Sequence, residues 1–335
     1  MLKKLPLLIL LFIISLPAQN DLRTQNIGNL KLTGGGVIKN CIVAYRVWGK
    51  ANADSSNIVI YPTWFAGSSE NLKGLLGKGR IVDTADYCVI GLDALSDGFS
   101  SSPSNTKLPA GEKFPDISVK DMVNSQYILL TKFLGIRKIH AVIGGSMGGM
   151  QTFEWLASYP GFMKKAVPYV GTPRPSLTDL VIWRNQVDMI EMAERCGLPP
   201  EEAMRAPNQV MHLFAYTQKY RNEKTPRENL EEYYNSHRKI NAPTFTPDNY
   251  KSQVKAMIKH DIYNGGKPEE FAPKIKANVF VIVASTDNLV YHGPAVELAK
   301  LINAKLHISD SYIGHIFVGN ELSTLSPMID AFLKE

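Results

Sequence analysis

The sequence predicts an α/β fold, a mostly parallel, doubly wound sheet interrupted once by an inserted helical lid. Strand-like apolar segments alternate with helical segments over residues 26–171, which we expect to form the first part of the core. The alternation stops over 172–266, the expected lid, and resumes over 267–335, the expected second part of the core. A chain of 335 residues, 44% of them hydrophobic, is long enough to bury such a core.

The first elements have strand patterns. Residues 26–32 and 41–48 alternate apolar and polar side chains around the glycines at 34–36, which predicts a β-hairpin. Residues 57–61 and 87–92 are short, continuous apolar runs. Such runs are typical of strands that are covered on both faces of a sheet.

The following segments predict the crossovers of a parallel sheet. Residues 79–86 are expected to form a helical or irregular crossover, and 96–115 a polar loop rich in Ser and Pro. Apolar residues at helical spacing predict a helix from Ser118 to Leu134, ended by Gly135. The remaining strands and helices of the core are expected at 139–143, 165–170, 278–284, 293–302, 305–308 and 322–333.

The segment 172–266 is helical in pattern, rich in methionine and aromatic residues, and without a strand-like run. A separate helical domain with no role at the site is the alternative to a lid. The return of the α/β pattern after the segment favours an insertion into the sheet domain.

A strand–turn–helix pattern surrounds Ser146. The apolar run 139–143 enters the motif Gly144-x-Ser146-x-Gly148, and a helical run leaves it and stops before Pro160. This is the context of a nucleophile elbow, whose tight turn needs glycine beside the serine and lifts the hydroxyl clear of the sheet. A glycine-rich turn that merely joins two elements is the alternative. Four glycines around one serine favour the nucleophile.

Serine becomes a good nucleophile only when a base takes its proton and a carboxylate orients that base. Asp287 follows one predicted strand, and His315 follows the next and precedes the last helix. The order serine, acid, histidine is that of an α/β-hydrolase fold. Rival acids on loops are Asp93, Asp97 and Asp310, of which Asp310 is the main competitor.

An acyl-transfer site also needs N–H donors for the developing oxyanion. The backbone N–H of Met147, at the start of the helix after the serine, is expected to supply one. The loop 62–68 is expected to supply the second, with the N–H of Phe65 as the first candidate and that of Trp64 as the alternative.

The composition excludes some functions. The net charge is +6, and about +4 without Lys3 and Lys4, which is too small and too dispersed to indicate nucleic-acid binding. Cys41, Cys88 and Cys196 are widely spaced and odd in number, so they predict neither a disulfide framework nor a metal site. No histidine lies in a metal-binding motif. We expect no metal and no cofactor.

Residues 1–19 have the pattern of a signal peptide: Lys3-Lys4, an apolar run to Leu16 and a plausible cleavage region ending at Gln19. Cleavage would leave Asn20 at the amino terminus. The apolar run is short for a transmembrane helix, which favours a cleaved signal peptide. An uncleaved anchor is the alternative. We expect an extracytoplasmic protein, periplasmic or secreted, without stable membrane insertion after cleavage.

Several motifs together resemble a known family. They are Gly98 to Asn105, Gly144-Gly-Ser-Met-Gly-Gly-Met-Gln151 with Glu154-Trp155, Thr286 to Leu289, and Gly314-His315. Over residues 37–335 the chain resembles the homoserine O-acetyltransferase branch of the α/β-hydrolase superfamily. The resemblance implies a covalent acyl-serine and ping-pong acyl transfer, with Ser146, Asp287 and His315 as the triad.

The chain also departs from that family's pattern. It has Gly91 to Ser96 in place of a Gly-Gly-Cys segment, and Ile316 in place of an aspartate after the base. The arginine and glutamine run that holds the homoserine carboxylate is not evident. Arg174 and Arg184 are candidate stand-ins for it, but surface or lid salt bridges are the favoured interpretation of both. These departures favour the hydrolase-like side of the family.

The sequence therefore predicts a secreted serine hydrolase acting on a small-molecule ester or related acyl compound. Water is the expected acyl acceptor, because acetyl-CoA is not expected outside the cytoplasm. An O-acyltransferase related to homoserine O-acetyltransferase and a non-catalytic binding protein are the alternatives. The complete set of serine, acid and histidine disfavours the binding protein. The sequence leaves the oligomeric state open, a dimer included.

Overall fold

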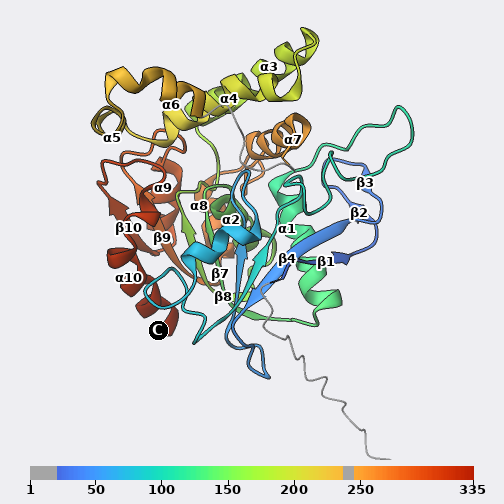
Figure 1. Cartoon of the computed structure of the whole chain (residues 1–335). Coiled ribbons are helices and arrows are strands. Elements are labelled where there is room, and N and C mark those ends of the chain that lie inside the picture. The colour runs from blue at the N-terminus through green and yellow to red at the C-terminus, as the bar shows by residue number, and fades with distance from the viewer. Residues whose placement is uncertain (1–20, 237–244) are drawn as a thin grey trace, which may run out of the picture.

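The computed structural model describes residues 21–236 and 245–335 (Figure 1). The proposed signal peptide at 1–19 lies outside the described residues. Within the described ranges, no helix combines the length and the apolar character needed to cross a membrane.

An eight-stranded sheet forms the centre of the molecule and confirms the predicted fold class (Figure 1). Its order is β1-β4-β6-β5-β7-β8-β9-β10. The six strands from β6 to β10 in that order pair in parallel, and β4 and β1 extend the sheet in antiparallel pairing. The strands are β1 (Arg23–Asn26), β4 (Ile42–Trp48), β5 (Ile58–Pro62), β6 (Cys88–Leu92), β7 (Ile139–Gly145), β8 (Met163–Tyr169), β9 (Asn278–Ala284) and β10 (Lys305–Ser309).

Helices cover both faces of the sheet and one of its ends. Helices α1, α2 and α9 contribute to the core on one face, and α10 packs on the other. Between β8 and β9 the chain forms α3 to α8, of which α3 to α6 lie over one end of the sheet (Figure 1). The helices are α1 (Val119–Ile128), α2 (Met147–Ser158), α3 (Leu177–Arg195), α4 (Pro200–Ala215), α5 (Gln218–Lys224), α6 (Leu230–Ser236), α7 (Pro247–Ile258), α8 (Pro268–Phe271), α9 (Gly293–Leu301) and α10 (Leu322–Lys334).

The predicted amino-terminal hairpin needs a correction. Strand β4 forms as expected, but in the main sheet it pairs with β1, which shares only Asn26 with the predicted segment. The short strands β2 (Leu30–Lys31) and β3 (Val37–Ile38) pair with each other in a separate two-stranded sheet. Gly28, with a φ of 81°, turns the chain out of the main sheet between β1 and β2.

The crossover at 79–86 is irregular, one of the two forms expected for it, and a 3₁₀ helix (Ser69–Leu75) precedes it. One helix boundary differs from the prediction. The expected helix from Ser118 to Leu134 is α-helical only as far as Ile128, and a π-helical turn (Leu129–Phe133) follows it. Side-chain periodicity does not distinguish an α-helical from a π-helical last turn, because the two differ in their hydrogen bonds.

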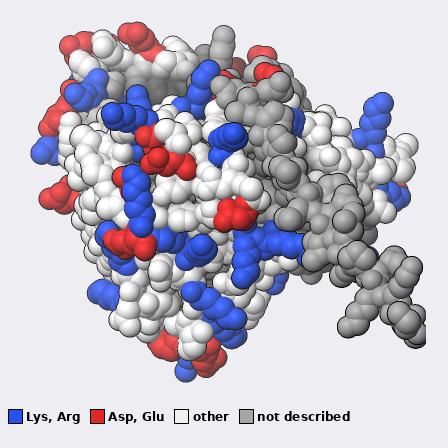
Figure 2. Space-filling model, turned by 90° about the horizontal axis from the view of Figure 1, so that it is seen from below, with Lys and Arg blue, Asp and Glu red and all other residues white. Residues whose placement is uncertain are grey.

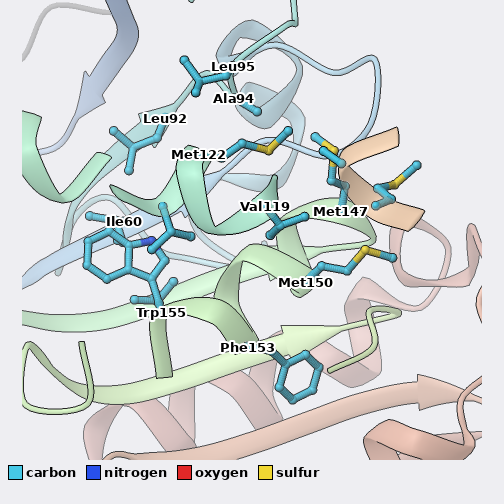
Figure 3. Packing of buried hydrophobic residues seen from close by; sticks show 14 of the residues in the cluster. Ile60, Leu92, Ala94, Leu95, Val119, Met122, Met147, Met150, Phe153 and Trp155 are labelled. Carbon is cyan, nitrogen blue, oxygen red and sulfur yellow. The ribbon is translucent and has the colours of Figure 1, made fainter. Parts of the chain in front are cut away.

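The core beside α2 is densely filled with large side chains (Figure 3). Val119 and Met122 of α1 and Trp155 of α2 gather there with Ile60 of β5 and Leu92 of β6, and none of the five is exposed. Fully burying one such side chain contributes about 1.5–3 kcal/mol. This packing fixes the position of α2, and with it the residue that begins the helix.

The end of the molecule remote from α3 to α6 has a mixed charge. Figure 2 shows Lys and Arg side chains interspersed with Asp and Glu on this face. Several surface cations of the protein are paired, including Lys334 with Asp86 at 3.2 Å and Lys305 with Glu335 at 3.6 Å. Exposed pairs of this kind contribute at most about 1 kcal/mol each.

A leucine pair tests how much the core on the α10 face contributes. Leu325→Ala should lower the free energy of unfolding by about 2–5 kcal/mol, because Leu325 is fully buried and its removal leaves a cavity. Leu177→Ala makes the same change at a side chain that is 77% exposed and should cost less than about 0.5 kcal/mol. Urea unfolding followed by circular dichroism measures both. Equal losses would contradict the described packing of α10.

Candidate active site

Ser146 occupies the tight turn between β7 and α2, the strand–turn–helix arrangement expected from its motif. Its backbone has φ 55° and ψ −123°, a conformation that residues other than glycine rarely adopt. The neighbouring glycines permit the turn. A Cβ atom at Gly144 would lie 2.3 Å from the carbonyl oxygen of Gly148, and one at Gly148 would lie 2.5 Å from that of Pro62.

The structure brings the three candidate catalytic side chains together. The Ser146 hydroxyl lies 2.9 Å from Nε2 of His315, and Nδ1 of His315 lies 2.7 Å from Oδ2 of Asp287. A carboxylate only accepts hydrogen bonds, so Nδ1 carries the proton and Nε2 is left as the acceptor for the serine hydroxyl. His315 is 5% exposed and Asp287 7%.

The second oxygen of Asp287 is also occupied. Its Oδ1 accepts hydrogen bonds from the backbone N–H groups of Leu289 and Val290, both at 2.9 Å. Hydrogen bonds at both oxygens fix the orientation of the carboxylate and hence that of the His315 ring.

The three rival acids lie elsewhere. Asp310 is exposed, and among the described residues no hydrogen bond joins it to His315. Asp93 accepts from the backbone N–H of Ser69 at 2.7 Å. Asp97 accepts from the N–H groups of the two residues at 99 and 100. The acid beside His315 is therefore Asp287.

Asp93 and Asp97, which follow β6, form a buried carboxyl pair. Burial raises the pKa of both groups, that of Asp97 well above its ordinary range, and the negative charge of Asp93 raises the pKa of Asp97 further. The Arg46 side chain acts on Asp93 in the opposite direction. Oδ2 of each carboxyl group is buried without a hydrogen-bond donor among the described residues, and the two groups interact, which favours a form in which one of them keeps its proton.

Both loops that carry the acid and the base are tied to the helices between β8 and β9. Asp179 of α3 accepts a hydrogen bond from the backbone N–H of Tyr291 at 3.0 Å, just beyond the Asp287 loop. Thr217, which caps α5, donates its backbone N–H to the carbonyl of Ile313 at 3.1 Å, just before His315. Asp179 has only 1% exposure.

Sequence analysis did not find Asp179 or Thr217. The pattern Ser176-x-x-Asp179 is a helix-capping signal, and the structure has that capping box at the start of α3. The pattern does not indicate that a carboxylate oxygen also reaches Tyr291, which is 112 residues away along the chain.

The candidate oxyanion donors lie around one cavity. Trp64, Phe65 and Ser146 line it, and Met147 follows the serine. Among the described residues, no acceptor is bound to the backbone N–H of Met147, Trp64 or Phe65. Phe65 and Trp64 therefore both stay candidates for the second donor.

Two glutamines hold the loop after β5 in place. Gln151 of α2 donates to the carbonyl oxygen of Thr63 at 2.9 Å, and Gln253 of α7 accepts from the backbone N–H of Ala66 at 3.0 Å. Neither glutamine side chain is exposed. These bonds fix the main chain on both sides of Trp64 and Phe65 relative to α2.

The cavity above Ser146 has a volume of about 550 Å³ and a mostly apolar lining. Aromatic and aliphatic side chains from several segments contribute, including Trp183 of α3, Met257 of α7 and Val318. Of the residues that line it, none is Asp or Glu. Its size and lining fit a small organic substrate.

Other candidate binding groups are occupied elsewhere. Arg174 donates to Asp261 at 2.9 Å and to the carbonyl of Gly266 at 2.6 Å, and Arg184 pairs with Asp188 on the surface of α3. Neither arginine lines the cavity. Within the described part of the chain, no three His, Cys, Asp or Glu side chains come together as a metal site would require.

Comparison with known proteins agrees with the fold. Residues 58–321 match the family described as alpha/beta hydrolase fold. The ethyl acetate hydrolase of Pseudomonas veronii is 29% identical over 326 residues, which cover 92% of this chain and 93% of the relative. The homoserine O-acetyltransferase of Geotalea daltonii is 27% identical over 350 residues, covering 92% and 95%. The acetyl esterase MekB superposes with a TM-score of 0.86 at 26% identity, covering 94% of this chain and 97% of that one.

The buried carboxyl pair generates a prediction on stability. Because the pKa of Asp97 is raised in the folded protein, its protonated form stabilises the fold. This stabilisation is fully present below the pKa of an unfolded aspartate, about 3.9, and is lost as pH rises through the raised pKa of the folded state. In Asp97→Asn the amide keeps an oxygen for the two backbone donors and offers an N–H to Asp93. Urea unfolding at pH 5 and pH 8 should therefore show a smaller loss of stability in the variant than in the wild type.

The exposed Asp310→Asn serves as the control for this comparison and should follow the wild type. If Asp97→Asn and wild type lost the same free energy between pH 5 and pH 8, the pair would not share a proton.

Proposed function

This chain belongs to the alpha/beta hydrolase fold family, and we propose that it is a serine esterase that forms an acyl-enzyme at Ser146. Its relatives are esterases and acetyltransferases, so the chain is an enzyme with ester hydrolase or acyltransferase activity. The observation that carries the finer proposal is the continuous hydrogen-bonded series from Ser146 through His315 to Asp287, beside an apolar cavity.

In the first half of the reaction the Ser146 hydroxyl attacks the ester carbonyl. His315 Nε2 takes the serine proton as the new carbon–oxygen bond forms, and Asp287 stabilises the imidazolium through Nδ1–H. The N–H of Met147 and that of Phe65, or of Trp64, hold the oxyanion. The carbonyl re-forms, the bond to the alcohol oxygen breaks, and the alcohol leaves with the proton from His315.

In the second half a water molecule replaces the alcohol. His315 takes a proton from the water as it attacks the acyl-serine carbonyl, and the same N–H groups hold the second oxyanion. The bond to Ser146 Oγ then breaks, His315 returns the proton to the serine, and the carboxylic acid is released.

Two observations support water as the acceptor. The ethyl acetate hydrolase and the probable esterase of Corynebacterium glutamicum are 29% and 28% identical over nearly the whole chain. Arg174 and Arg184, the arginines considered for an amino-acid carboxylate, are engaged away from the cavity. The proposed signal peptide points the same way, because acetyl-CoA is not expected outside the cytoplasm.

Acyl transfer to an alcohol acceptor such as homoserine is the second candidate. The homoserine O-acetyltransferases at 27% identity favour it. It shares the acyl-serine and differs only in what enters after the first product leaves. Acetyl-CoA consumption with and without homoserine, measured beside ester hydrolysis, separates the two.

Replacing the nucleophile tests the proposal most directly. Ser146→Ala should lower kcat/KM for 4-nitrophenyl acetate by about 10⁴- to 10⁶-fold, because no acyl-enzyme can form. It should also abolish labelling by a fluorophosphonate probe. Ser323→Ala, at an exposed serine of α10, should leave both readouts close to wild type. Retention of most of the activity by Ser146→Ala would contradict the proposed nucleophile.

The acid is tested by a second pair of variants. Asp287→Asn should leave the fold intact and lower kcat by about 10⁴-fold, because an amide at this place favours the wrong histidine tautomer. Asp310→Asn changes a nearby exposed aspartate in the same way and should have little effect. Steady-state kinetics with circular dichroism as the folding control measures both. A large loss in Asp310→Asn with a small loss in Asp287→Asn would reverse the assignment.

A further inference from the structure

The cavity above Ser146 extends to both faces of the sheet. On one face Trp183, Met257, Leu289 and Val290 line it and pack with the core that contains α2. On the other face Leu75, Val318 and Leu322 line it and pack with the core that contains α10. We call these two parts the closed limb and the open limb.

The closed limb is apolar and shielded. Trp183, Met257, Leu289 and Val290 are each exposed by 5% or less. A group bound there is separated from water and limited in size by buried side chains.

The open limb ends at polar groups. The exposed side chain of Arg80 and that of Asn71 line it beside the half-buried Leu75 and Leu322. Asn71 Oδ1 accepts a hydrogen bond from the backbone N–H of Ser68 at 2.8 Å, so its amide nitrogen is the atom left to donate. Both polar side chains at this end therefore offer N–H groups.

Arg80 is held at the open limb by a short, well-bonded turn. Its own N–H donates to the carbonyl of Gly77 at 3.1 Å, and the N–H of Ile81 donates to that of Leu75 at 2.9 Å. Gly77 and Gly79 have φ values of 110° and 70°, which favour glycine. The next residue, Ile81, is buried and anchors the turn.

No carboxylate of the described residues is paired with Arg80. In the described ranges Arg80 makes no ion pair, and no acidic side chain lines the cavity. The nearest acid in sequence, Asp83, accepts a hydrogen bond from the backbone N–H of Ala85 at 3.0 Å and does not line the cavity. Glu70 pairs with Arg46 at 3.2 Å. A guanidinium that faces a substrate cavity without a partner matches a carboxylate, which it can bind with two parallel hydrogen bonds.

We propose that the open limb is a subsite for a carboxylate on the alcohol part of the substrate, bound by Arg80 and Asn71. This rests on the proposed esterase function. The acyl group belongs in the closed limb, because it stays bonded to Ser146 while the alcohol leaves, and the exposed side chains of Arg80 and Asn71 give the open limb access to solvent. Water adds across the acyl–oxygen bond and yields the free acid and a hydroxy acid.

A matched pair of acetate esters tests the subsite. 4-Acetoxybenzoate carries a carboxylate on the alcohol part, and methyl 4-acetoxybenzoate is its neutral counterpart. Arg80→Gln should lower kcat/KM for the anionic ester roughly tenfold more than for the neutral ester, through KM more than through kcat. Because each ester is compared with itself between variants, the difference in leaving-group chemistry cancels. Arg80→Lys should recover part of the loss.

Two controls separate a local contact from the general field of the protein. Lys78→Gln removes an exposed cation of the same turn that does not line the cavity, and should affect the two esters equally. Sodium chloride should weaken the reaction of the wild type with the anionic ester and have a much smaller influence on Arg80→Gln.

An equal effect of Arg80→Gln on the two esters would overturn the subsite. So would a loss confined to acetyl-CoA turnover, which would assign the anion to a CoA phosphate. Failure of the proposed function is recognised separately, because wild type would then hydrolyse neither ester in a Ser146-dependent way.

Discussion

The strained turn at Ser146 is the constraint on which the rest of the site depends. A residue other than glycine in this conformation costs about 1–3 kcal/mol, and the surroundings must hold it there. The backbone N–H of Ser146 donates to the carbonyl of Tyr169 on the neighbouring strand, and its own carbonyl accepts from Met150 one turn into α2. The buried face of α2, with Trp155 at its centre, supplies the packing that offsets the strain.

From this turn, hydrogen bonds reach the other parts of the site. Trp155 donates to Gln126, Gln126 to Gln151, and Gln151 to the carbonyl of Thr63, all in the buried interior. The nucleophile and the loop with the candidate oxyanion donors are thus parts of one rigid unit. Buried and satisfied networks of this kind specify one geometry, because breaking one bond leaves a polar group unpaired.

Much of this was accessible from the sequence, where the determining interactions are local. The continuous apolar run predicted β9 with both of its ends, at Asn278 and Ala284, because a strand buried on both faces has no polar side chains until it leaves the sheet. The elbow was predicted because the serine, its glycines and the flanking strand and helix are adjacent in the sequence, although Gly148 is required by a distant contact, with the carbonyl of Pro62. The order of the acid and base loops followed from their positions after successive strands.

What could not be predicted depends on contacts between distant segments. The predicted partner of β4 was wrong, because the chain turns out of the main sheet at Gly28. The alternation of apolar and polar side chains does not reveal the positive φ of this residue. Asp179 resembled an ordinary capping residue, and Arg80 an ordinary surface cation. Only the fold brings one to the acid loop and the other to the cavity.

The attachments of Asp179 and Thr217 also make the helices between β8 and β9 unsuitable for exchange as a module. A graft from another hydrolase would bring a new specificity pocket but would release both loops that hold the acid and the base, so recombination in this family should succeed only where those two contacts travel with the segment.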